Sequence, residues 1–596
     1  MATPTIQELA QEWIRLDRNP KTRAEIENLV NENNFDELEK RLRNRIAFGT
    51  AGLRSSMQAG FAHMNDLTVV QATQGLCKYV LKTVPNAAER GVVIGHDHRY
   101  NSDMFAKLTA GVFLSQGVKV YFYRKLVHTP LVPFGVKTLN ASCGIMITAS
   151  HNPKDDNGYK VYWENACQII PPHDKGIAQT IEENLELWGW NSELVDQSDL
   201  CIDPTEEMTS KYLDALEKLS QNKSKNGESK VKFVYSAMHG VGGEISCKAF
   251  ERFGFKPFEV VKEQFVPNPD FPTVKFPNPE ENGALDLAVK TASECGATLV
   301  LANDPDADRL ACSQRLADGS WYTFTGNELG TILASKVLAD RKASGKFNNK
   351  CAMLASAVSS KMLQAMGDAE GFYFEETLTG FKWLGNRAIS LEPEGYDTMF
   401  AFEEAIGFMV EDVVRDKDGV SALVVFAELA AQLASEGKTV YDHLQELYKK
   451  YGFFVSNNSY YICRSKPTID AIFNKIRFGG NPVAANNDYG YELAYPTHFN
   501  GVKVTYIRDL TIGYDTSRDD KKPVLPVSAS SHMITFKLEN SLVITLRTSG
   551  TEPKIKWYSE MTGPDRDQVR KELDALVKVI TDDLLEPSVN NLEART

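Results

Sequence analysis

Three aspartates, Asp304, Asp306 and Asp308, alternate with other residues in the segment NDPDADR, directly after the apolar run ATLVLA. Carboxylates at alternate positions can converge on one hard divalent cation, and without a cation they would repel one another. The segment is not an EF-hand loop, because Arg309 stands where that loop needs glycine and Arg315 where it needs glutamate. A solvated acidic turn is the alternative. The preceding apolar run favours a metal site, with Arg309 placed to hold a phosphate oxygen beside the cation.

A serine follows a second apolar run, GIMIT, in the segment TASHNPKDDNGYK. Ser150 is a candidate nucleophile, and the adjacent His151 is the obvious candidate for its base. Successive side chains in an extended or turning backbone point apart, so a neighbour rarely reaches the hydroxyl at hydrogen-bond distance. We therefore expect His151 to shape the loop or contact phosphate, and any base to come from elsewhere in the chain.

Several other segments combine glycines with polar side chains. RTSGTEPK, from Arg547 to Lys554, follows the strand-like run LVITL; its hydroxyls and backbone N–H groups could bind an anion, with arginine adding a bidentate charge. The two glycines of GTAGLR, which ends at Arg54, allow a close approach to a ligand. The paired acids of FEEAIGF could hold sugar hydroxyls. For each segment, an ordinary polar turn is the alternative, as it is for LTGFKWLGN and RDKDG.

Three histidine-containing segments carry weaker indications. GHDHR places Asp97 and Arg99 at a strand end, where ligand-facing residues often lie in open α/β sheets, but we expect no direct role for them. His128 in VHTPLVP is interpreted as structural, and His239 in MHGVGG as a turn residue.

The elements that must position these residues alternate along most of the chain. GVVIG and VKVYFY predict strands on either side of a helix that starts at Asn101 or Ser102 and stops at Gly117. This βαβ pattern predicts a sheet with parallel strands covered by helices. It restarts at VKFVY, after a polar stretch over residues 219–230, and again at Thr325, which forms a capping box with Glu328. From about Phe453 the pattern changes to antiparallel strands around helices. We predict three α/β domains with mixed sheets, over residues 1–205, 206–322 and 323–452, and an α+β domain over residues 453–596.

Composition narrows the class of protein. The 596 residues are 42% hydrophobic and 24% charged, and the net charge of −13 argues against nucleic acid or an anionic membrane as the main partner. Nine scattered cysteines without a CxxC pair indicate a reducing compartment. The N-terminal segment MATPTIQELAQEWIRLD has no apolar signal core and predicts an amphipathic helix, and no apolar run approaches the ~20 residues of a membrane span. We expect a cytoplasmic protein.

Taken in order, GTAGLR, TASHNP…GYK, DPDADR, TGFKWLGN, FEEAIG…RDKDG and RTSGT resemble the α-D-phosphohexomutase superfamily, most closely its eukaryotic phosphoglucomutase-2 / phosphopentomutase branch. The resemblance spans nearly the whole chain. It implies four domains around a central cleft and a phosphosugar mutase. Such an enzyme interconverts sugar 1-phosphates with glucose 6-phosphate or with ribose and deoxyribose 5-phosphates, through a phosphoserine and a bisphosphate intermediate. The expected cofactors are Mg²⁺ and glucose 1,6-bisphosphate as activator. The expected partners are phosphosugars, without nucleic acid or membrane, and the protein is expected to be a monomer or dimer.

The resemblance also implies roles for individual residues. Ser150 would carry the phosphoryl group and bind Mg²⁺ together with the three aspartates. The other residues implied in catalysis are Arg54, His151, Lys160 and Lys417, with Lys417 as a candidate proton shuttle. The residues implied in substrate binding are Arg54, Arg309, Thr379, Gly380, Glu403, Lys417, Arg547, Ser549, Gly550 and Thr551.

One departure bears on the substrate. Hexose-specific members commonly have Gly-Glu-x-Ser in the sugar loop, where this chain has Phe402, Glu403, Glu404 and Ala405. The missing hydroxyl makes a pentose substrate plausible. A glucose 1,6-bisphosphate synthase and a metal-dependent sugar phosphatase remain as alternatives, although RTSGT favours a mutase over a phosphatase. The presence of Ser150, the three aspartates and Arg547 argues against a scaffold without catalysis.

Overall fold

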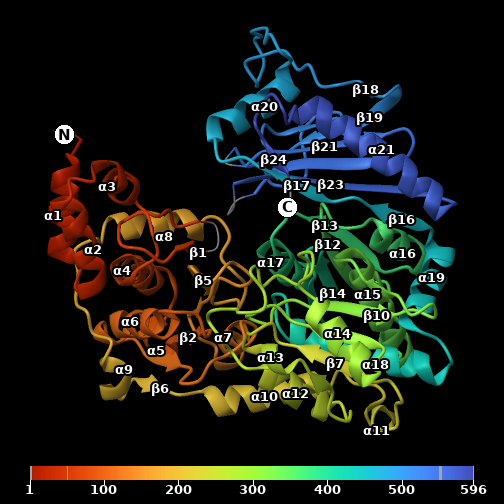
Figure 1. Cartoon of the computed structure of the whole chain (residues 1–596), viewed down its shortest axis with the longest axis horizontal. Coiled ribbons are helices and arrows are strands. Elements are labelled where there is room, and N and C mark those ends of the chain that lie inside the picture. The colour runs from red at the N-terminus through yellow and green to blue at the C-terminus, as the bar shows by residue number, and fades with distance from the viewer. Residues whose placement is uncertain (1–2, 50–51, 530, 550–552, 595–596) are drawn as a thin grey trace. The chain divides into compact units, whose positions relative to one another are not determined.

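The computed structural model describes residues 3–49, 52–529, 531–549 and 553–594. The chain forms two compact units: residues 1–354 with 380–443, and residues 355–379 with 444–596 (Figure 1). All nine cysteines lie in the described ranges and are free. Among the described residues no single helix is long and apolar enough to cross a membrane; α18 and α19 meet that test only as a pair, which is bent by 90°.

The first unit begins with a six-stranded sheet in the order β1-β5-β4-β2-β3-β6. Neighbours among β4, β2, β3 and β6 are parallel, as the βαβ pattern predicts, whereas β5 and β1 add an antiparallel edge beside β4. The strands are β1 (Gly52–Ser56), β2 (Val92–His96), β3 (Val120–Phe122), β4 (Cys143–Ile147), β5 (Asp156–Trp163) and β6 (Cys201–Ile202). The parallel strands place the C-terminal ends of β2 and β4 at one edge, where the serine segment begins.

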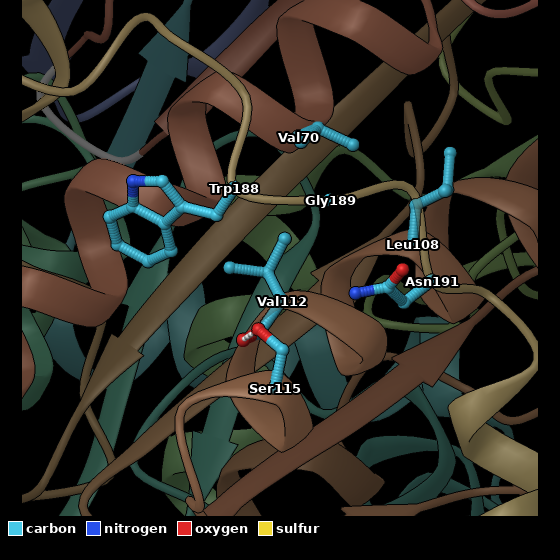
Figure 2. Close-up of a pocket in the computed structure, with 7 residues that line it drawn as sticks. All are labelled: Val70, Leu108, Val112, Ser115, Trp188, Gly189 and Asn191. Atoms are coloured by element: carbon cyan, nitrogen blue, oxygen red, sulfur yellow. Dashed lines mark hydrogen bonds between the residues drawn. The ribbon is translucent and has the colours of Figure 1, made fainter.

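Helices cover both faces of this sheet, with α6 and α7 on either side of β2 (Figure 1). The segment after α8 closes over α4 and α6, and Figure 2 shows Trp188 and Asn191 lining a small pocket with Val70, Leu108 and Val112. The helices are α4 (Asp66–Thr83), α5 (Ala87–Arg90), α6 (Ser102–Ser115), α7 (Leu131–Leu139), α8 (His173–Glu182), α9 (Leu194–Gln197) and α10 (Thr205–Glu217).

The N-terminal segment forms the predicted amphipathic helix, α1 (Ile6–Leu16), which starts at a capping box formed by Thr5 and Glu8. Together with α2 (Pro20–Asn31) and α3 (Phe35–Leu42) it encloses a small core of its own, in which Trp13 is fully buried.

A second sheet has the order β11-β10-β9-β7-β8. The strands β8, β7 and β9 are parallel, and β10 returns antiparallel to β9, so the aspartate segment is the connection between β9 and β10. The elements are α11 (Lys223–Asn226), β7 (Phe233–Ser236), α12 (Gly242–Arg252), β8 (Glu259–Val260), α13 (Lys262–Phe265), α14 (Asp286–Cys295), β9 (Leu299–Ala302), β10 (Ala311–Arg315) and β11 (Trp321–Thr323).

The third α/β domain starts at α15, where the predicted capping box between Thr325 and Glu328 is formed. The division into two units runs through this domain, because residues 355–379 cluster with the second unit. The antiparallel pair β14–β15 belongs to the first unit. The elements are α15 (Gly326–Ala343), β12 (Cys351–Ser356), α16 (Met362–Glu370), β13 (Tyr373–Thr377), α17 (Phe381–Leu391), a 3₁₀ turn (Glu392–Glu394), β14 (Asp397–Glu403), β15 (Gly407–Val410), α18 (Gly419–Ser435) and α19 (Val440–Tyr451).

The C-terminal part of the second unit is the predicted antiparallel domain. Its sheet follows the path β18-β19-β21-β22-β23-β17-β24, with β16 beside β23 and β20 beside β19. Alternate apolar residues of the central strands pack with α20 and α21 in one core. The elements are β16 (Phe453–Ser456), β17 (Ser459–Ile462), α20 (Lys466–Phe478), β18 (His498–Phe499), β19 (Val502–Asp509), β20 (Tyr514–Asp515), β21 (Met533–Leu538), β22 (Val543–Thr548), β23 (Lys554–Gly563), α21 (Arg566–Leu585) and β24 (Glu593–Ala594).

Candidate active site

Ser150 lies just beyond β4, in a connection to β5 that we call the serine loop (residues 150–156). Its backbone is left-handed, with φ of 53°, and its N–H donates to Thr148 Oγ1 at 2.9 Å. Its hydroxyl donates to Asp304 Oδ2 at 3.1 Å and lies 3.4 Å from His151 Nδ1. The expectation that the neighbouring ring is out of reach is therefore wrong. That expectation assumed an extended or turning backbone, whereas a left-handed residue need not point its side chain away from the next one.

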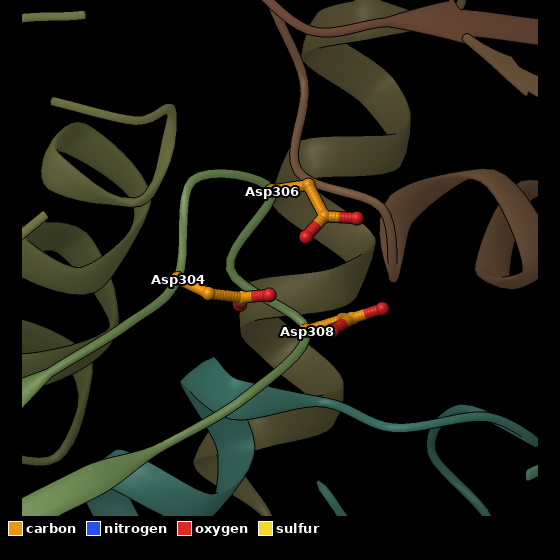
Figure 3. A group of neighbouring side chains, drawn as sticks. All are labelled: Asp304, Asp306 and Asp308. Atoms are coloured by element: carbon orange, nitrogen blue, oxygen red, sulfur yellow. The ribbon is translucent and has the colours of Figure 1, made fainter. Parts of the chain in front are cut away.

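The three aspartates project from the β9–β10 connection into one space (Figure 3), and one carboxylate oxygen from each lies within 4.8 Å of the others. All three residues are fully buried. Asp306 Oδ1 and Asp308 Oδ1 are buried without a hydrogen-bond partner in the described part of the chain. A solvated acidic turn does not fit this burial. Oxygen donors with unused lone pairs fit a hard divalent cation, which prefers anionic oxygen ligands.

Two lysines contact the aspartates in this structure. Lys160 Nζ donates to Asp306 Oδ2 at 2.7 Å and to Asp308 Oδ2 at 3.2 Å, and Lys417 Nζ lies 3.2 Å from Asp308 Oδ2. Burial acts to raise the pKa of Asp308, but these ammonium groups and Arg309 outweigh it, and the net shift is downward. At Asp304, burial and repulsion from the other two carboxylates raise the pKa well above its usual value.

Thr129 is a contact of this cluster that the sequence analysis missed. Its hydroxyl donates to Asp306 Oδ2 at 2.6 Å, and its N–H donates to the Asp306 carbonyl at 2.9 Å. Thr129 lies in the connection between the parallel strand β3 and α7, the kind of position where ligand-facing residues gather in open α/β sheets. That rule was the one available indication. Arg54, on β1, donates to the Asn152 side chain in the serine loop at 3.3 Å.

The sugar-loop residues lie near the same cluster. Arg309 forms a β-bridge with Gly407, and its Nε lies 3.8 Å from Asp304 Oδ2 and 3.7 Å from Asp308 Oδ1. Gly407 leaves room for Lys417, because a Cβ there would lie only 2.4 Å from Lys417 Cδ. The structure thus brings Ser150, His151, Arg54, Lys160, Arg309, Lys417 and the three aspartates together around one cluster.

Glu403 closes β14, and Ala405 lies in the turn to β15. Glu403 Oε1 accepts a hydrogen bond from the Gly380 N–H at 2.6 Å. Burial, together with repulsion from Glu404, raises the pKa of Glu403. The two sugar-loop segments, TGFKWLGN and FEEAIGF, therefore meet at this carboxylate.

The remaining predicted substrate residues belong to the second unit. Arg547, on β22, donates through Nη1 to Thr379 Oγ1. The Ser549 N–H donates to the Lys554 carbonyl at 3.0 Å. Gly550 and Thr551 lie outside the described residues.

The two remaining histidines match their structural interpretation. His128 is buried against Tyr212, with ring centroids 4.9 Å apart, and burial lowers its pKa to about 3. His239 has a left-handed backbone with φ of 60°, and its Nε2 lies 2.7 Å from Thr273 Oγ1.

Comparisons with known proteins match most of the chain. Family models described as phosphoglucomutase/phosphomannomutase alpha/beta/alpha domains I, II and III match residues 45–187, 210–317 and 325–451. The chain is 47% identical to human "Phosphopentomutase", over 99% of this chain and 97% of that protein. It is 46% identical to human "Glucose 1,6-bisphosphate synthase", over 99% and 96%. It is 44% identical to "Phosphoribomutase" of Saccharomyces cerevisiae, over 92% and 91%.

Solved structures show the same fold. The Paramecium phosphoglucomutase pp63/parafusin in an open form aligns with a TM-score of 0.62 at 18% identity, over 91% of this chain and 95% of that chain. A phosphoglucomutase/phosphomannomutase family protein from Burkholderia thailandensis aligns with a TM-score of 0.60 at 17% identity, over 91% and 98%.

Proposed function

This chain belongs to the α-D-phosphohexomutase superfamily, and from that premise we propose that it is a phosphosugar mutase with Ser150 as its phosphoryl carrier. One observation supports this most directly: Ser150 Oγ lies 3.1 Å from a carboxylate of the buried aspartate cluster. A phosphoryl group on that oxygen would lie beside the site of a divalent cation. Lys160 and Arg309 contact the same aspartate cluster and Arg54 contacts Asn152 of the serine loop, so their charges can receive phosphate oxygens.

The proposed reaction transfers two phosphoryl groups in turn, the first from Ser150 to the sugar and the second from the sugar to Ser150. The bond between phosphorus and Ser150 Oγ breaks as a sugar hydroxyl oxygen bonds to that phosphorus, which gives a sugar bisphosphate and a free serine hydroxyl. Lys417 is the candidate proton shuttle: its ammonium group gives a proton to the departing Ser150 oxygen, and the resulting amine takes the proton of the attacking sugar hydroxyl. The bisphosphate then turns around, and its other phosphoryl group returns to Ser150. Glu403 would hold sugar hydroxyls, and Arg547 and Ser549 would hold the phosphate that is not transferred.

We assign Mg²⁺ to Asp304, Asp306 and Asp308, together with an oxygen of phosphorylated Ser150. When bound, the ion neutralises charge on the phosphoryl group during transfer. Buried carboxylate oxygens of these aspartates would be its ligands, and two of those oxygens have no hydrogen-bond partner among the described residues. A sugar bisphosphate such as glucose 1,6-bisphosphate would activate the enzyme by phosphorylating Ser150.

We propose that pentose and hexose phosphates are both substrates. The names of the human and yeast relatives point to pentose phosphates, and Ala405 lacks the hydroxyl expected of a hexose-specific loop. A missing hydrogen bond to a neutral partner costs about 0.5–1.5 kcal/mol, which is up to roughly tenfold in binding. This difference biases the choice between sugars without excluding either.

A panel of glucose 1-phosphate, mannose 1-phosphate and ribose 1-phosphate, each with and without a bisphosphate primer, tests the proposal. We expect turnover of glucose and ribose phosphates, with the pentose at least competitive in kcat/KM, and a shift toward glucose in Ala405→Ser. Ser150→Ala should form no phosphoenzyme by peptide mass spectrometry and should lose nearly all turnover. Full activity of that variant would contradict the role of Ser150. If the wild type does not turn over ribose 1-phosphate, or if Ala405→Ser leaves the ratio of pentose to glucose activity unchanged, only the substrate assignment is contradicted.

A second candidate is supported by the 46% identity to human "Glucose 1,6-bisphosphate synthase". The same serine would then pass its phosphoryl group to a sugar monophosphate and be recharged by a separate phosphoryl donor, such as an acyl phosphate. Release of bisphosphate as the main product in the presence of that donor, with little isomerisation, would favour the synthase over the mutase.

A further inference from the structure

The motif GHDHR at the end of β2 carries Arg99, whose side chain is fully buried. Its guanidinium donates four hydrogen bonds, all to backbone carbonyl oxygens of the serine loop. Nη2 donates to Ser150 O at 2.7 Å and Asn152 O at 2.6 Å, and Nη1 donates to Pro153 O at 2.8 Å and Asp156 O at 3.2 Å. One side chain therefore fixes the path of the backbone from the first residue of the loop to the last.

Asp97 and Phe271 in turn contact Arg99. Asp97 Oδ2 lies 3.4 Å from Arg99 Nε, while Asp97 Oδ1 accepts from the Arg99 N–H at 2.9 Å and from Ser102 Oγ at 2.6 Å. The ring of Phe271 lies below the guanidinium, with its centroid 5.0 Å from Cζ. A guanidinium in a fixed plane can serve four oxygens at once, whereas a lysine ammonium has only three donors on a flexible stem.

These bonds account for the strained backbone at Ser150. A left-handed conformation is unfavourable for serine and persists only where the surroundings over-determine it. The Thr148 hydroxyl holds the Ser150 N–H, and Arg99 holds the Ser150 carbonyl, so both sides of the residue are fixed. In a trans peptide the C=O and the following N–H point in opposite directions. With their preceding carbonyls on Arg99, the N–H groups of His151 and Lys154 face away from the guanidinium.

We propose that Arg99 is a positioning residue: it holds the serine loop in the conformation that aims Ser150 Oγ at the aspartate cluster. Arg99 acts through the backbone: its guanidinium donates to the carbonyl oxygens of Ser150, Asn152, Pro153 and Asp156. The kinetic consequence rests on the proposed function, whereas the loop conformation can be measured without substrate.

The test compares Arg99→Lys with Arg90→Lys in the full-length protein. Arg90 also donates to backbone carbonyls in the same domain, to Asn140 O at 3.0 Å and Ala141 O at 3.3 Å, but at the other end of β4. Hydrogen–deuterium exchange should become faster in peptides spanning residues 148–158 for Arg99→Lys and stay unchanged there for Arg90→Lys. For Arg99→Lys we expect kcat to fall roughly 100-fold, as for a reacting atom misplaced by about 1 Å, with KM unchanged. Arg90→Lys should keep both constants.

A second variant covers the case in which Arg99→Lys loosens the whole domain. Asp97→Asn keeps the oxygen that accepts from Arg99 N–H and Ser102 but removes the negative charge beside Nε, so we expect a smaller change of the same kind in loop exchange and kcat. Wild-type loop exchange in both variants would overturn the proposal, as would a fall in kcat without any change in the loop. Faster loop exchange in a protein whose wild type turns over no phosphosugar would leave the positioning role intact and overturn the proposed function instead.

Discussion

Positively charged side chains lie close around the three carboxylates of the aspartate cluster. Lys160, Lys417 and Arg309 surround the three carboxylates, and Thr129 adds a neutral donor. Lone pairs on Asp306 and Asp308 nevertheless stay without hydrogen bonds in the described part of the chain. A buried acceptor left in this way is costly unless a ligand uses it. The arrangement therefore favours a cation that coordinates these oxygens over a purely structural ion-pair network.

Asp306→Asn should weaken Mg²⁺ binding, because it removes one anionic ligand from the cluster. We expect a loss of affinity at least as large as the roughly 10- to 100-fold typical of residues that only support metal ligands. Isothermal titration calorimetry of the metal-free protein with Mg²⁺ would measure it, and turnover should be lost with chelator and restored by added Mg²⁺. Asp318→Asn, an exposed aspartate in the β10–β11 turn, is the matched control. Equal affinity of the two variants, or turnover that needs no metal, would count against the assignment.

At the scale of elements, the periodicity of apolar residues was sufficient to predict those strands and helices that serve only packing. The strands β2, β7 and β9 and the helices α6 and α15 lie where the sequence predicts them. The strand β5, which is buried except at Asp156, was not predicted, because it carries Asn157 and Lys160 at buried positions. Asn157 bonds to Ser102 and Lys160 to Asp306, so these polar residues break the hydrophobic pattern in order to build the site.

The candidate site shows the same limit. Ser150 and the aspartates could be found from local motifs, because each stands in a distinctive stretch of sequence. Lys417 was found only through the family resemblance, because RDKDG by itself is an ordinary charged turn. The roles of Thr129 and Arg99 depend on which loops the fold brings together, and no local pattern around either residue specifies that. The reach of His151 depends on one backbone dihedral, at Ser150, which its neighbours set through tertiary hydrogen bonds.

The capping box of α15 gives a prediction at the scale of one element. Thr325 Oγ1 accepts from the Glu328 N–H at 3.2 Å, and Glu328 Oε2 accepts from the Thr325 N–H at 2.9 Å. Thr325→Ala should lower the free energy of unfolding by about 1 kcal/mol, because the first turn loses a partner for an N–H group. Urea denaturation would measure the change. Thr325→Ser keeps the hydroxyl and should be close to wild type; equal losses in both variants would show that the methyl group, not the cap, matters.

At the scale of the whole chain, Glu428 on α18 joins the third domain to residues 220–226 of the second domain. Its carboxylate accepts from Ser220 Oγ at 2.5 Å and from Asn226 Nδ2 at 3.0 Å, and from the N–H groups of Gln221 and Asn222 at 3.0 and 3.1 Å. Lys336 Nζ lies 3.2 Å away. The polar stretch over residues 219–230, which lies inside the predicted second domain, is thus held by Glu428 within the first unit.

Glu428→Gln should destabilise the protein by about 3–5 kcal/mol, the range for breaking a buried ion pair by removing one partner. In the variant, the amide nitrogen would also point its N–H groups at hydrogen-bond donors that the carboxylate of Glu428 accepts from in the wild type. Burial opposes the charge, but the donors around it and Lys336 lower the pKa of Glu428. Its contribution should therefore be full at neutral pH and disappear on acidification through that lowered pKa. Chemical denaturation at pH 7 and at acid pH would measure both. Gln432→Ala, exposed on the same helix, should change little; a similar loss there would contradict the clamp.

The hydrogen bond between Ser150 and Asp304 joins residues 154 positions apart. A ribosome adding ~5–20 residues per second makes the serine roughly 8 to 30 seconds before the carboxylate that it contacts, and N-terminal domains begin to fold first. During that interval the nascent chain holds a serine loop without a cation site. Under the proposed function, Ser150 is therefore first phosphorylated only after both segments have been made, and a truncated translation product that ends between them would lack the three aspartates that we assign to the cation.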